Sequence, residues 1–551
     1  MAVSDWKKSV VYQIYPKSFN DTTGNGQGDI PGIIEKLPYL QTLGVDYIWL
    51  TPIYQSPMND NGYDISDYYQ INPDFGTKED VKTLLDEAHS LGIKVMLDIV
   101  INHTSTSHNW FVESRKSKDN PYRDYYIWKE GTKEEPPTNW ESKFGGNAWT
   151  YDEQTESYYL RLFDVSQADL NWENDNLKAE IYEMINYWID FGVDGFRFDV
   201  INLISKGAFE NPPPFSTAIG KEFYTDGPKV HEYLQELNKQ TFGNKDIMTV
   251  GEMSSTTIDN CIKYTNPERN ELSSVFNFHH LKVDYKDGEK WSDMKFDFLE
   301  LKRILMDWQV NIAKGNGWNA IFWCNHDQPR VVTRFGKDDT EAERVKSAKM
   351  LAISLHMLQG TPYIYQGEEI GMTDPGFKDI DQYKDVESLN AYKLLKERGM
   401  DEQMIMKVIG QKSRDNSRTP IQWNAHAEAG FTTGEPWIGI PENYKHINVE
   451  AALEDKNSIF YTYQKLIQLR HEHDVITYGE VEPLHLEHPE LFVYKRHLNN
   501  ETWLVVANYS DQIVDIPEDI DLEGEIMIAN NDLNGNALQP FDAFVVKVSG
   551  D

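Results

Sequence analysis

The sequence predicts an α/β protein: a (β/α)8 TIM barrel with an inserted subdomain after the third strand and a C-terminal antiparallel β-sandwich domain. Three observations predict it. Eight short apolar runs alternate with amphipathic helical patterns, a long insertion separates the third and fourth runs, and the final segment changes to short alternating runs. Strands that alternate with helices form parallel βαβ units, and eight such units close into a barrel.

The eight expected strands are rich in β-branched and aromatic residues. They lie at 10–16, 47–53, 94–103, 195–200, 247–253, 273–278, 319–327 and 362–369. Helical periodicity fills the intervals, for example at 32–44, 78–92 and 176–192. An open doubly wound sheet is the alternative, but it favours a G-x-G-x-x-G turn after an early strand, and this sequence has none there.

The spacing of the strands sets the expected domains. About 90 residues separate the third and fourth strands, which is far longer than an ordinary loop. Near the C-terminus, runs such as LFVYKRHL and AFVVKVSG are typical of antiparallel strands. We therefore expect a barrel of residues 1–103 and 171–470, an inserted subdomain of 104–170 and a β domain of 471–551.

Composition excludes several classes of protein. The 551 residues carry a formal net charge of −36, which argues against a nucleic-acid partner because such partners need a basic surface. No segment approaches the ~20 apolar residues of a membrane span. Two cysteines are too few for a disulfide framework. We expect a cytoplasmic monomer that acts on a small molecule, without a membrane partner and without an organic cofactor.

Charged side chains interrupt the apolar strand GFRFDV, residues 195–200. Arg197 and Asp199 share one face of it because side chains alternate along a strand. Burying such groups is costly unless they are paired. Further acids, Glu252 and Asp327, lie at the ends of the fifth and seventh expected strands. Barrel enzymes place their chemistry at these carboxyl ends, so the clustered acids predict a functional site.

Three carboxylates without a Cys/His metal-ligand spacing predict acid–base and nucleophilic chemistry at an acetal. Glycoside hydrolysis needs one protonated carboxyl to donate to the leaving oxygen and one ionised carboxylate. We expect Arg197 to favour the charged form of Asp199 and to fix its orientation.

Four short blocks carry a family resemblance: DIVINH (98–103), GFRFDV (195–200), VGEM (250–253) and NHDQPR (325–330). In this order they make the chain resemble the α-amylase family of retaining α-glycosidases over essentially its whole length. The resemblance implies Asp199 as nucleophile, Glu252 as general acid/base and Asp327 as a third carboxylate that holds ring hydroxyls. It also implies sugar-binding roles for Asp60, Tyr63, His103, Arg197, His326 and Arg414.

One segment departs from the related exo-acting α-glucosidases of this family. FNFHHLKVDY (276–285) places His279 and Lys282 where the related pattern is acidic. With His280 and Lys290, they predict a site for a substrate phosphate, because lysine suits phosphate. Solvated lysines and core histidines are the alternative. We expect a sugar phosphate as substrate, with neutral α-1,6-linked glucosides as the alternative.

The loop DTTGNGQGD (21–29) alternates oxygen-bearing side chains. These residues are Asp21, Thr23, Asn25, Gln27 and Asp29. Oxygen ligands at alternate positions suit a hard cation, and with the family resemblance they predict a structural Ca²⁺ or Mg²⁺ ion. The full EF-hand pattern is absent, and an Asx-rich turn without metal is the alternative.

Two other functions compete with hydrolysis. A catalytically inactive barrel serving as a partner subunit predicts lost carboxylates and a membrane segment, and the sequence shows neither. A sugar-isomerising transferase on the same scaffold would keep the same carboxylates. Loop shape decides between water and sugar as the acceptor, so this alternative stays open.

Overall fold

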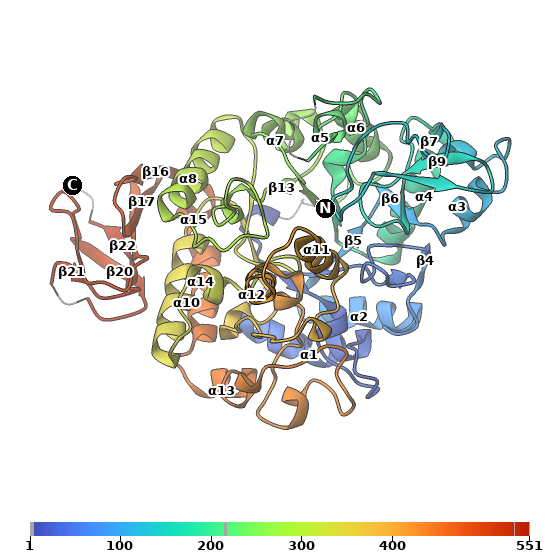
Figure 1. Ribbon diagram of the computed structural model, residues 1–551. Helices are drawn as coiled ribbons and strands as arrows, with labels where there is room; N and C mark the ends of the chain where they lie inside the picture. The colour runs from blue at the N-terminus through green and yellow to red at the C-terminus, as the bar shows by residue number, and fades with distance from the viewer. Residues whose placement is uncertain (1–4, 214–217, 534, 550–551) are drawn as a thin grey trace. The chain divides into compact units, whose positions relative to one another are not determined.

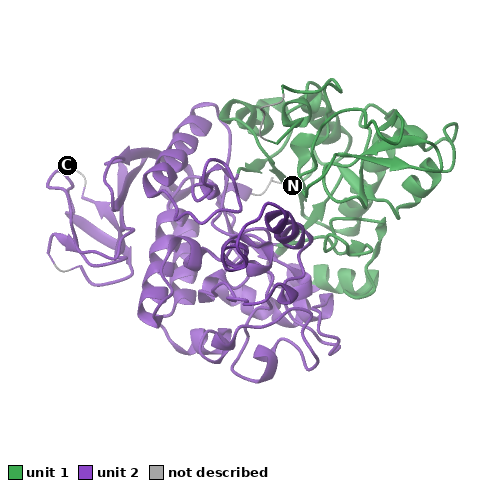
Figure 2. Ribbon diagram, viewed as in Figure 1, with its two compact units in different colours: residues 1–4, 49–86, 94–277 green, residues 5–48, 87–93, 278–551 purple. Residues whose placement is uncertain are grey.

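The structure is a computed structural model that describes residues 5–213, 218–533 and 535–549. The chain divides into two compact units, which Figure 2 colours separately. The first contains Trp49–Asp86 and Lys94–Asn277, and the second contains Asp5–Ile48, Glu87–Ile93 and Phe278–Asp551. The predicted domain boundaries stay a prediction.

Eight strands form one sheet in the order β13-β12-β11-β5-β2-β1-β15-β14. Figure 1 labels β5 and β13 of this sheet. They are β1 (Val11–Ile14), β2 (Tyr47–Leu50), β5 (Lys94–Ile99), β11 (Gly195–Phe198), β12 (Met248–Glu252), β13 (Ser274–Phe276), β14 (Ala320–Ile321) and β15 (Thr361–Tyr365). Each strand coincides with a predicted run. The order follows the chain, and the last two strands join the first because β15 pairs in parallel with β1, so the sheet is nearly closed. This confirms the predicted (β/α)8 barrel.

In the first unit, the register of β5, β11 and β12 brings charged side chains together. These strands pair in parallel, with Arg197 of β11 opposite Asp98 of β5 and Val250 of β12. Asp199 directly follows β11, and Glu252 is the last residue of β12. The carboxyl ends of neighbouring parallel strands lie at the same edge of the sheet, so both acids emerge there.

The three helices named from periodicity are confirmed as α1 (Ile30–Leu43), α2 (Lys78–Ser90) and α4 (Asp175–Phe191). Helix α4 begins after Asn174, whose side chain accepts a hydrogen bond from the N–H of Leu177. It ends at Gly192, where φ is 114°, a conformation that favours glycine. Capping at both ends explains why the boundaries are close to those expected.

Residues 104–170 contain a small antiparallel sheet in the order β7-β9-β8. Its strands are β7 (Trp128–Glu130), β8 (Trp149–Asp152) and β9 (Ser157–Leu160). Trp140 and Trp149 lie in its core, and Val200 packs into the same cluster. Val200 has φ 37° and ψ 40°, a left-handed conformation that is strained for a β-branched residue. The inserted segment therefore packs on the residue that follows Asp199.

In the second unit, the C-terminal strands form a five-stranded antiparallel sheet. Its order is β16 (Glu480–Leu484), β17 (Leu491–Leu498), β18 (Glu501–Asn508), β22 (Ala543–Val548) and β20 (Gly524–Ala529). A two-stranded sheet of β19 (Val514–Asp515) and β21 (Ala537–Leu538) contributes Val514 and Leu538 to the same core. The β character of this segment is confirmed. The structure adds β16, an edge strand in which Pro483 is tolerated.

The remaining described elements connect these sheets and cover them. The longer helices are α6 (Val230–Gln240), α7 (Ile258–Thr265), α8 (Phe298–Lys314), α10 (Glu341–His356), α11 (Val386–Glu397), α12 (Glu402–Lys412) and α14 (Ile459–Glu472). The shorter helices are α3 (Asn109–Ser114), α5 (Lys221–Tyr224), α9 (Val331–Phe335), α13 (Val449–Glu454) and α15 (Asp474–Tyr478). The other strands are β3 (Tyr54–Gln55), β4 (Asp67–Ile71), β6 (His103–Ser105) and β10 (Gln167–Asp169). Helices α11 and α12 enclose a small core of their own, which the sequence did not predict.

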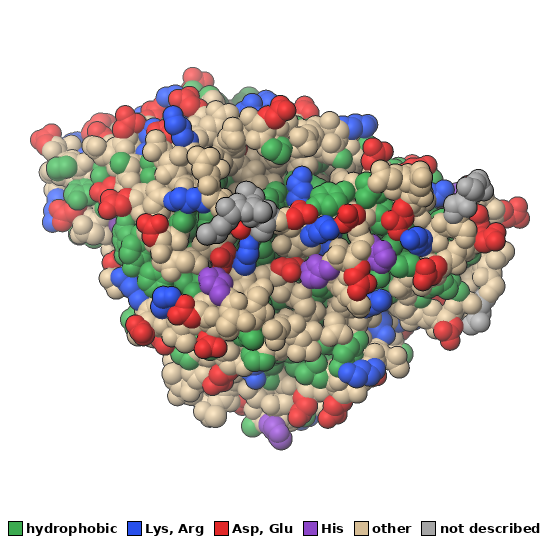
Figure 3. Space-filling model, turned by 180° about the vertical axis from the view of Figure 1, so that it is seen from behind, with side chains coloured by type: hydrophobic (Ala, Val, Ile, Leu, Met, Phe, Trp, Pro, Cys, Tyr) green, Lys and Arg blue, Asp and Glu red, His purple; other side chains and the backbone are tan. Residues whose placement is uncertain are grey.

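Within the described residues, no helix is both long enough and apolar enough to cross a bilayer. On the face drawn in Figure 3, acidic and basic side chains are interspersed rather than gathered into a basic area.

Candidate active site

Arg197 is the buried centre of a charged cluster in the first unit. Its Nη1 donates to Asp98 Oδ1 at 2.9 Å and to Asp199 Oδ1 at 2.8 Å, and its Nη2 donates to Glu252. Arg197 is 1% exposed, so these pairings must offset the cost of removing its charge from water. One guanidinium therefore orients three carboxylates, of which Asp199 is the one predicted from the sequence.

Asp98 anchors this arginine from the neighbouring strand. Its Oδ2 accepts hydrogen bonds from Trp49 Nε1 at 3.2 Å and from the Tyr63 hydroxyl at 2.9 Å. Burial raises the pKa of Asp98 to about 6, although Arg197 opposes the rise. No role for Asp98 was predicted from the sequence. Its acidic side chain in a buried strand was the available signal, and it holds Tyr63, a predicted sugar-binding residue, in place.

Asp199 and Glu252 lie close enough to hydrogen-bond to each other. Burial raises the pKa of Asp199 well above its usual range, the charge of Glu252 raises it further, and Arg197 lowers it. Burial and the charge of Glu252 together outweigh Arg197, so the net shift of the Asp199 pKa is upward. The expectation that Arg197 keeps Asp199 ionised is wrong. Carboxyl groups in such contact do not both ionise freely, because like charges repel each other. Such a pair supplies one acid and one base.

Two other predicted sugar-binding residues, Asp60 and His103, meet around Gln167. The Gln167 Nε2 atom donates to Asp60 Oδ2 at 3.0 Å and lies 3.3 Å from His103 Nε2. Burial lowers the pKa of His103 to about 4, so its ring is neutral at pH 7. Gln167, which begins the segment QADLNW, was not among the residues predicted from the sequence.

Asp327 lies at the centre of a second cluster, in the second unit. Its Oδ1 is 2.7 Å from Arg418 Nη2 and 3.5 Å from Arg414 Nη1, and its Oδ2 is 3.3 Å from His326 Nε2. Burial raises the pKa of Asp385, but Arg414 and Arg418 outweigh it and hold that pKa far below its usual range. The structure thus groups Asp327, His326 and Arg414 as predicted.

Arg418 and Asp385 are additions to this second cluster. Arg418 stands four residues after Arg414 in the sequence RDNSR, a spacing that could have drawn attention to it. Asp385 Oδ1 accepts a hydrogen bond from Arg414 Nη2 at 2.6 Å. No feature of the sequence pointed to Asp385. The meeting of the first cluster and Asp327 around one sugar stays a prediction.

The predicted phosphate residues do not behave alike. His280 is buried, and its Nε2 lies 2.8 Å from the Phe322 carbonyl oxygen. Burial lowers its pKa to about 4, so the ring is neutral and belongs to the core. The prediction that His280 binds phosphate is wrong. His279 packs against Trp308, whereas Lys282 is exposed.

Lys290 already has an anionic partner. Its Nζ lies 2.8 Å from both carboxylate oxygens of Glu387. The Arg414 Nε atom approaches the same carboxylate at 3.3 Å. A substrate phosphate would therefore have to share Lys290 with Glu387, and the predicted phosphate site stays a prediction.

The loop 21–29 forms a closed turn in the structure. The Asp21 carboxylate accepts hydrogen bonds from the N–H groups of Thr23, Gly24 and Gly26 and from the Thr432 hydroxyl. The Asp29 carboxylate caps α1 and accepts from Thr22. The part of the chain that the structure describes contains no group of three or more His, Cys, Asp or Glu arranged to hold a metal. A cation here would have to share oxygens that protein donors already use.

The calcium site consequently stays a prediction, and a thermal-unfolding measurement tests it. A cation that binds the folded state alone stabilises it by mass action. We expect EDTA to lower the melting temperature and added Ca²⁺ to restore it. A melting temperature that chelation leaves unchanged contradicts the site, and the loop is then an Asx turn without metal.

Comparison with known proteins places these clusters in a family. The α-amylase catalytic domain profile matches residues 13–479. The chain is 56% identical to the trehalose-6-phosphate hydrolase of Bacillus subtilis (strain 168) over 99% of this chain and 98% of that one. It is 52% identical to the oligo-1,6-glucosidase of Parageobacillus thermoglucosidasius, with 98% and 99% covered.

A solved structure agrees with both comparisons. The crystal structure of Bacillus licheniformis trehalose-6-phosphate hydrolase superposes with a TM-score of 0.93 at 57% identity, covering 98% of this chain and 99% of that one. Sequence and fold match along nearly the full length, and the carboxylates around Arg197 and Asp327 stand at the ends of the expected strands. The chain therefore belongs to the α-amylase family of glycoside hydrolases.

Proposed function

We propose that this protein is a retaining α-glucosidase that hydrolyses trehalose 6-phosphate to glucose and glucose 6-phosphate. The observation that carries the chemistry is the adjacent pair Asp199 and Glu252, held by Arg197. The choice of substrate rests on similarity to trehalose-6-phosphate hydrolases and on the basic residues of segment 276–285. A cytoplasmic monomer that uses no organic cofactor is part of the same proposal.

The reaction proceeds in two steps. Asp199 attacks the anomeric carbon while Glu252 protonates the departing oxygen, which releases glucose 6-phosphate and leaves a covalent glucosyl-enzyme. Glu252 then takes a proton from water, and the water oxygen displaces Asp199 with net retention. The contact between the two carboxyls favours this route, because retaining pairs lie about 5–5.5 Å apart and inverting pairs are more widely separated. Asp327 holds sugar hydroxyls through hydrogen bonds that strengthen in the transition state.

A substrate comparison tests the proposal. We expect glucose release from trehalose 6-phosphate to exceed that from trehalose, isomaltose and sucrose at equal concentration, because a charge-assisted contact to phosphate contributes about 1.5–3 kcal/mol. The readout is kcat/KM for each sugar at one ionic strength. Preference for isomaltose would favour the second candidate, an oligo-1,6-glucosidase, which the similar enzyme of Parageobacillus thermoglucosidasius makes the main competitor.

The phosphate contact has a sharper test in Lys282→Glu. We expect kcat/KM on trehalose 6-phosphate to fall by about 10- to 100-fold, because the change removes a cation and adds a repelling charge. Turnover of isomaltose or another neutral α-glucoside should change little. The matched control is Lys286→Glu, an exposed lysine of the same segment. Equal losses on charged and neutral sugars would assign Lys282 a structural role instead.

A further inference from the structure

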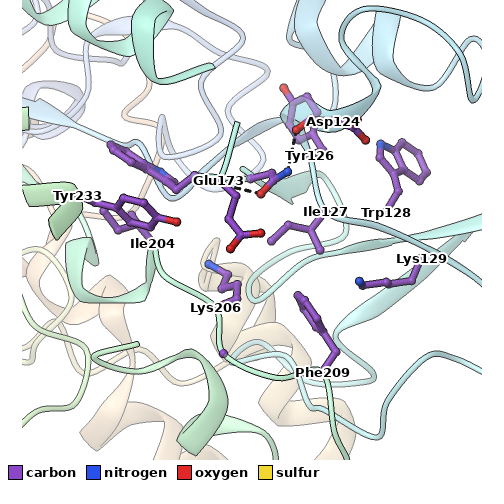
Figure 4. Close-up of a pocket in the computed structure, with 13 residues that line it drawn as sticks. Asp124, Tyr126, Ile127, Trp128, Lys129, Glu173, Ile204, Lys206, Phe209 and Tyr233 are labelled. Atoms are coloured by element: carbon purple, nitrogen blue, oxygen red, sulfur yellow. Dashed lines mark hydrogen bonds between the residues drawn. The ribbon is translucent and has the colours of Figure 1, made fainter. Parts of the chain in front are cut away.

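Lys206 is a buried lysine behind the first-unit cluster. It lines a cavity of about 270 Å³ and is drawn among the lining residues with Glu173 and Phe209 in Figure 4. Its side chain is only 5% exposed. The ammonium group lies 2.9 Å from Asp169 Oδ2 and donates to Asn102 Oδ1 at 2.8 Å. The lysine is therefore committed to these partners rather than to solvent.

These contacts fix the orientation of the Asn102 amide. An ammonium group has donors and no acceptor, so the amide atom that faces Lys206 is the oxygen. The amide nitrogen then faces Asp169 Oδ2 at 3.2 Å and His103 Nδ1 at 3.1 Å. Asn102 consequently presents an N–H group to one ring nitrogen of His103.

Gln167 presents an N–H group to the other ring nitrogen. Its Oε1 accepts from the Asp164 N–H at 3.0 Å, which leaves Nε2 facing Asp60 and His103. One ring N–H of His103 can donate to the Tyr63 backbone carbonyl. The second N–H of a protonated ring would face an amide N–H group. The geometry therefore favours the neutral ring, in which one nitrogen can accept.

The charges around His103 act in opposite directions. Burial lowers its pKa to about 4, Asp169 raises it and Lys206 lowers it. In the antiparallel pairing of β10 with β6, Asp169 lies opposite His103, so its charge is close to the ring. Asp60 faces the same region through Gln167. Lys206 is the cation that balances this acidic surrounding.

We propose that Lys206 is a positioning residue for the glycosidase reaction, which keeps His103 neutral by fixing the Asn102 amide and neutralising Asp169. This inference rests on the proposed role of His103 as a sugar ligand. The transition state of glycoside hydrolysis is oxocarbenium-like and carries positive charge. A neutral ring can hydrogen-bond the sugar without opposing that charge, whereas a cationic ring would repel it.

Kinetics as a function of pH test the proposal. In Lys206→Met, the negative charge of Asp169 has lost its cationic partner and the Asn102 amide is free to rotate. The pKa of His103 should therefore rise. The protonated fraction then grows as the pH falls. A rise of one unit from about 4 should lower kcat/KM by about 2-fold at pH 5 and leave it nearly unchanged at pH 8. Lys206→Arg keeps the charge and should retain the wild-type profile. The double variant Lys206→Met/Asp169→Asn removes both charges and should restore the shape of the profile.

A direct titration separates this inference from the proposed function. NMR of protein labelled at histidine, with His103→Gln used to assign the signal, reports the His103 pKa without any substrate. We expect a rise of at least one pH unit in Lys206→Met and recovery in the double variant. An unchanged His103 pKa in a folded variant overturns the proposal even if activity falls. If Lys206→Met does not fold, a wild-type pKa in Lys206→Arg and in the double variant supports it, and a raised pKa in both refutes it.

Discussion

Replacing Asp199 with Asn is expected to lower kcat by about 10⁴-fold or more on every α-glucoside the protein hydrolyses. The amide is no longer a nucleophile, and removal of a covalent nucleophile costs effects of this size. Asn keeps the shape of the side chain and one oxygen that can accept from Arg197. We therefore expect the circular dichroism spectrum and the melting temperature to stay close to those of the wild type, and single-turnover assays to show no glucosyl-enzyme.

The matched control for this variant is Asp246→Asn. Asp246 pairs with Lys94 at 3.3 Å and its side chain is 42% exposed, so its loss should leave kcat unchanged. If Asp199→Asn turned over substrate at a near-normal rate, Asp199 would not be the nucleophile and the proposed two-step reaction would be wrong.

Arg197→Met is expected to be the most destabilising single change in the first unit. It removes the cation shared by three carboxylates and leaves their charges buried, and breaking a buried ion pair in this way costs about 3–5 kcal/mol. Urea unfolding at pH 7 measures the loss in free energy of unfolding. The control is Arg303→Met, which breaks an exposed pair with Glu300 and should cost less than about 1 kcal/mol.

The pH dependence of this loss has a definite sign. The pKa of Asp98 is raised to about 6 in the folded protein, so the folded state binds more protons than the unfolded state between roughly pH 4 and pH 6. Its contribution to stability is therefore present below that window and is lost as the pH rises through it. Without Arg197 the pKa of Asp98 rises further, so the variant should lose more stability at pH 8 than at pH 5. A loss that grows toward acid would contradict this account.

Elements with a strong local pattern could be predicted from the sequence. All eight barrel strands match apolar runs, because β-branched and aromatic residues bounded by turns are a local signal. The C-terminal strands β17, β18, β20 and β22 match for the same reason. Strand β16 was missed because its pattern is weak and Pro483 interrupts it. The helix pair α11 and α12 was missed because its small core is formed by residues whose contacts no periodicity reveals.

The site illustrates the same division. Motif spacing identified Asp199, Glu252 and Asp327, because their positions at strand ends are encoded along the chain. The pairing of side chains that are distant in sequence could not be predicted from motif spacing. Nothing in the sequence indicated that Arg197 is shared with Asp98, or that Lys290 is already paired with Glu387. His280 was misassigned because a histidine in a basic segment and a histidine bonded to a core carbonyl are indistinguishable by sequence.

The pairing of β1 with β15 has a consequence for how the protein is made. Val11 lies opposite Tyr363, so the first strand emerges from the ribosome long before its partner exists. Contacts between residues so far apart in sequence form late and slow the folding of a domain. Until then β1 offers an unpaired edge, which is a site for aggregation. Nascent chains that stall before residue 361 should therefore depend on chaperones, whereas chains that extend past 365 can complete the ring.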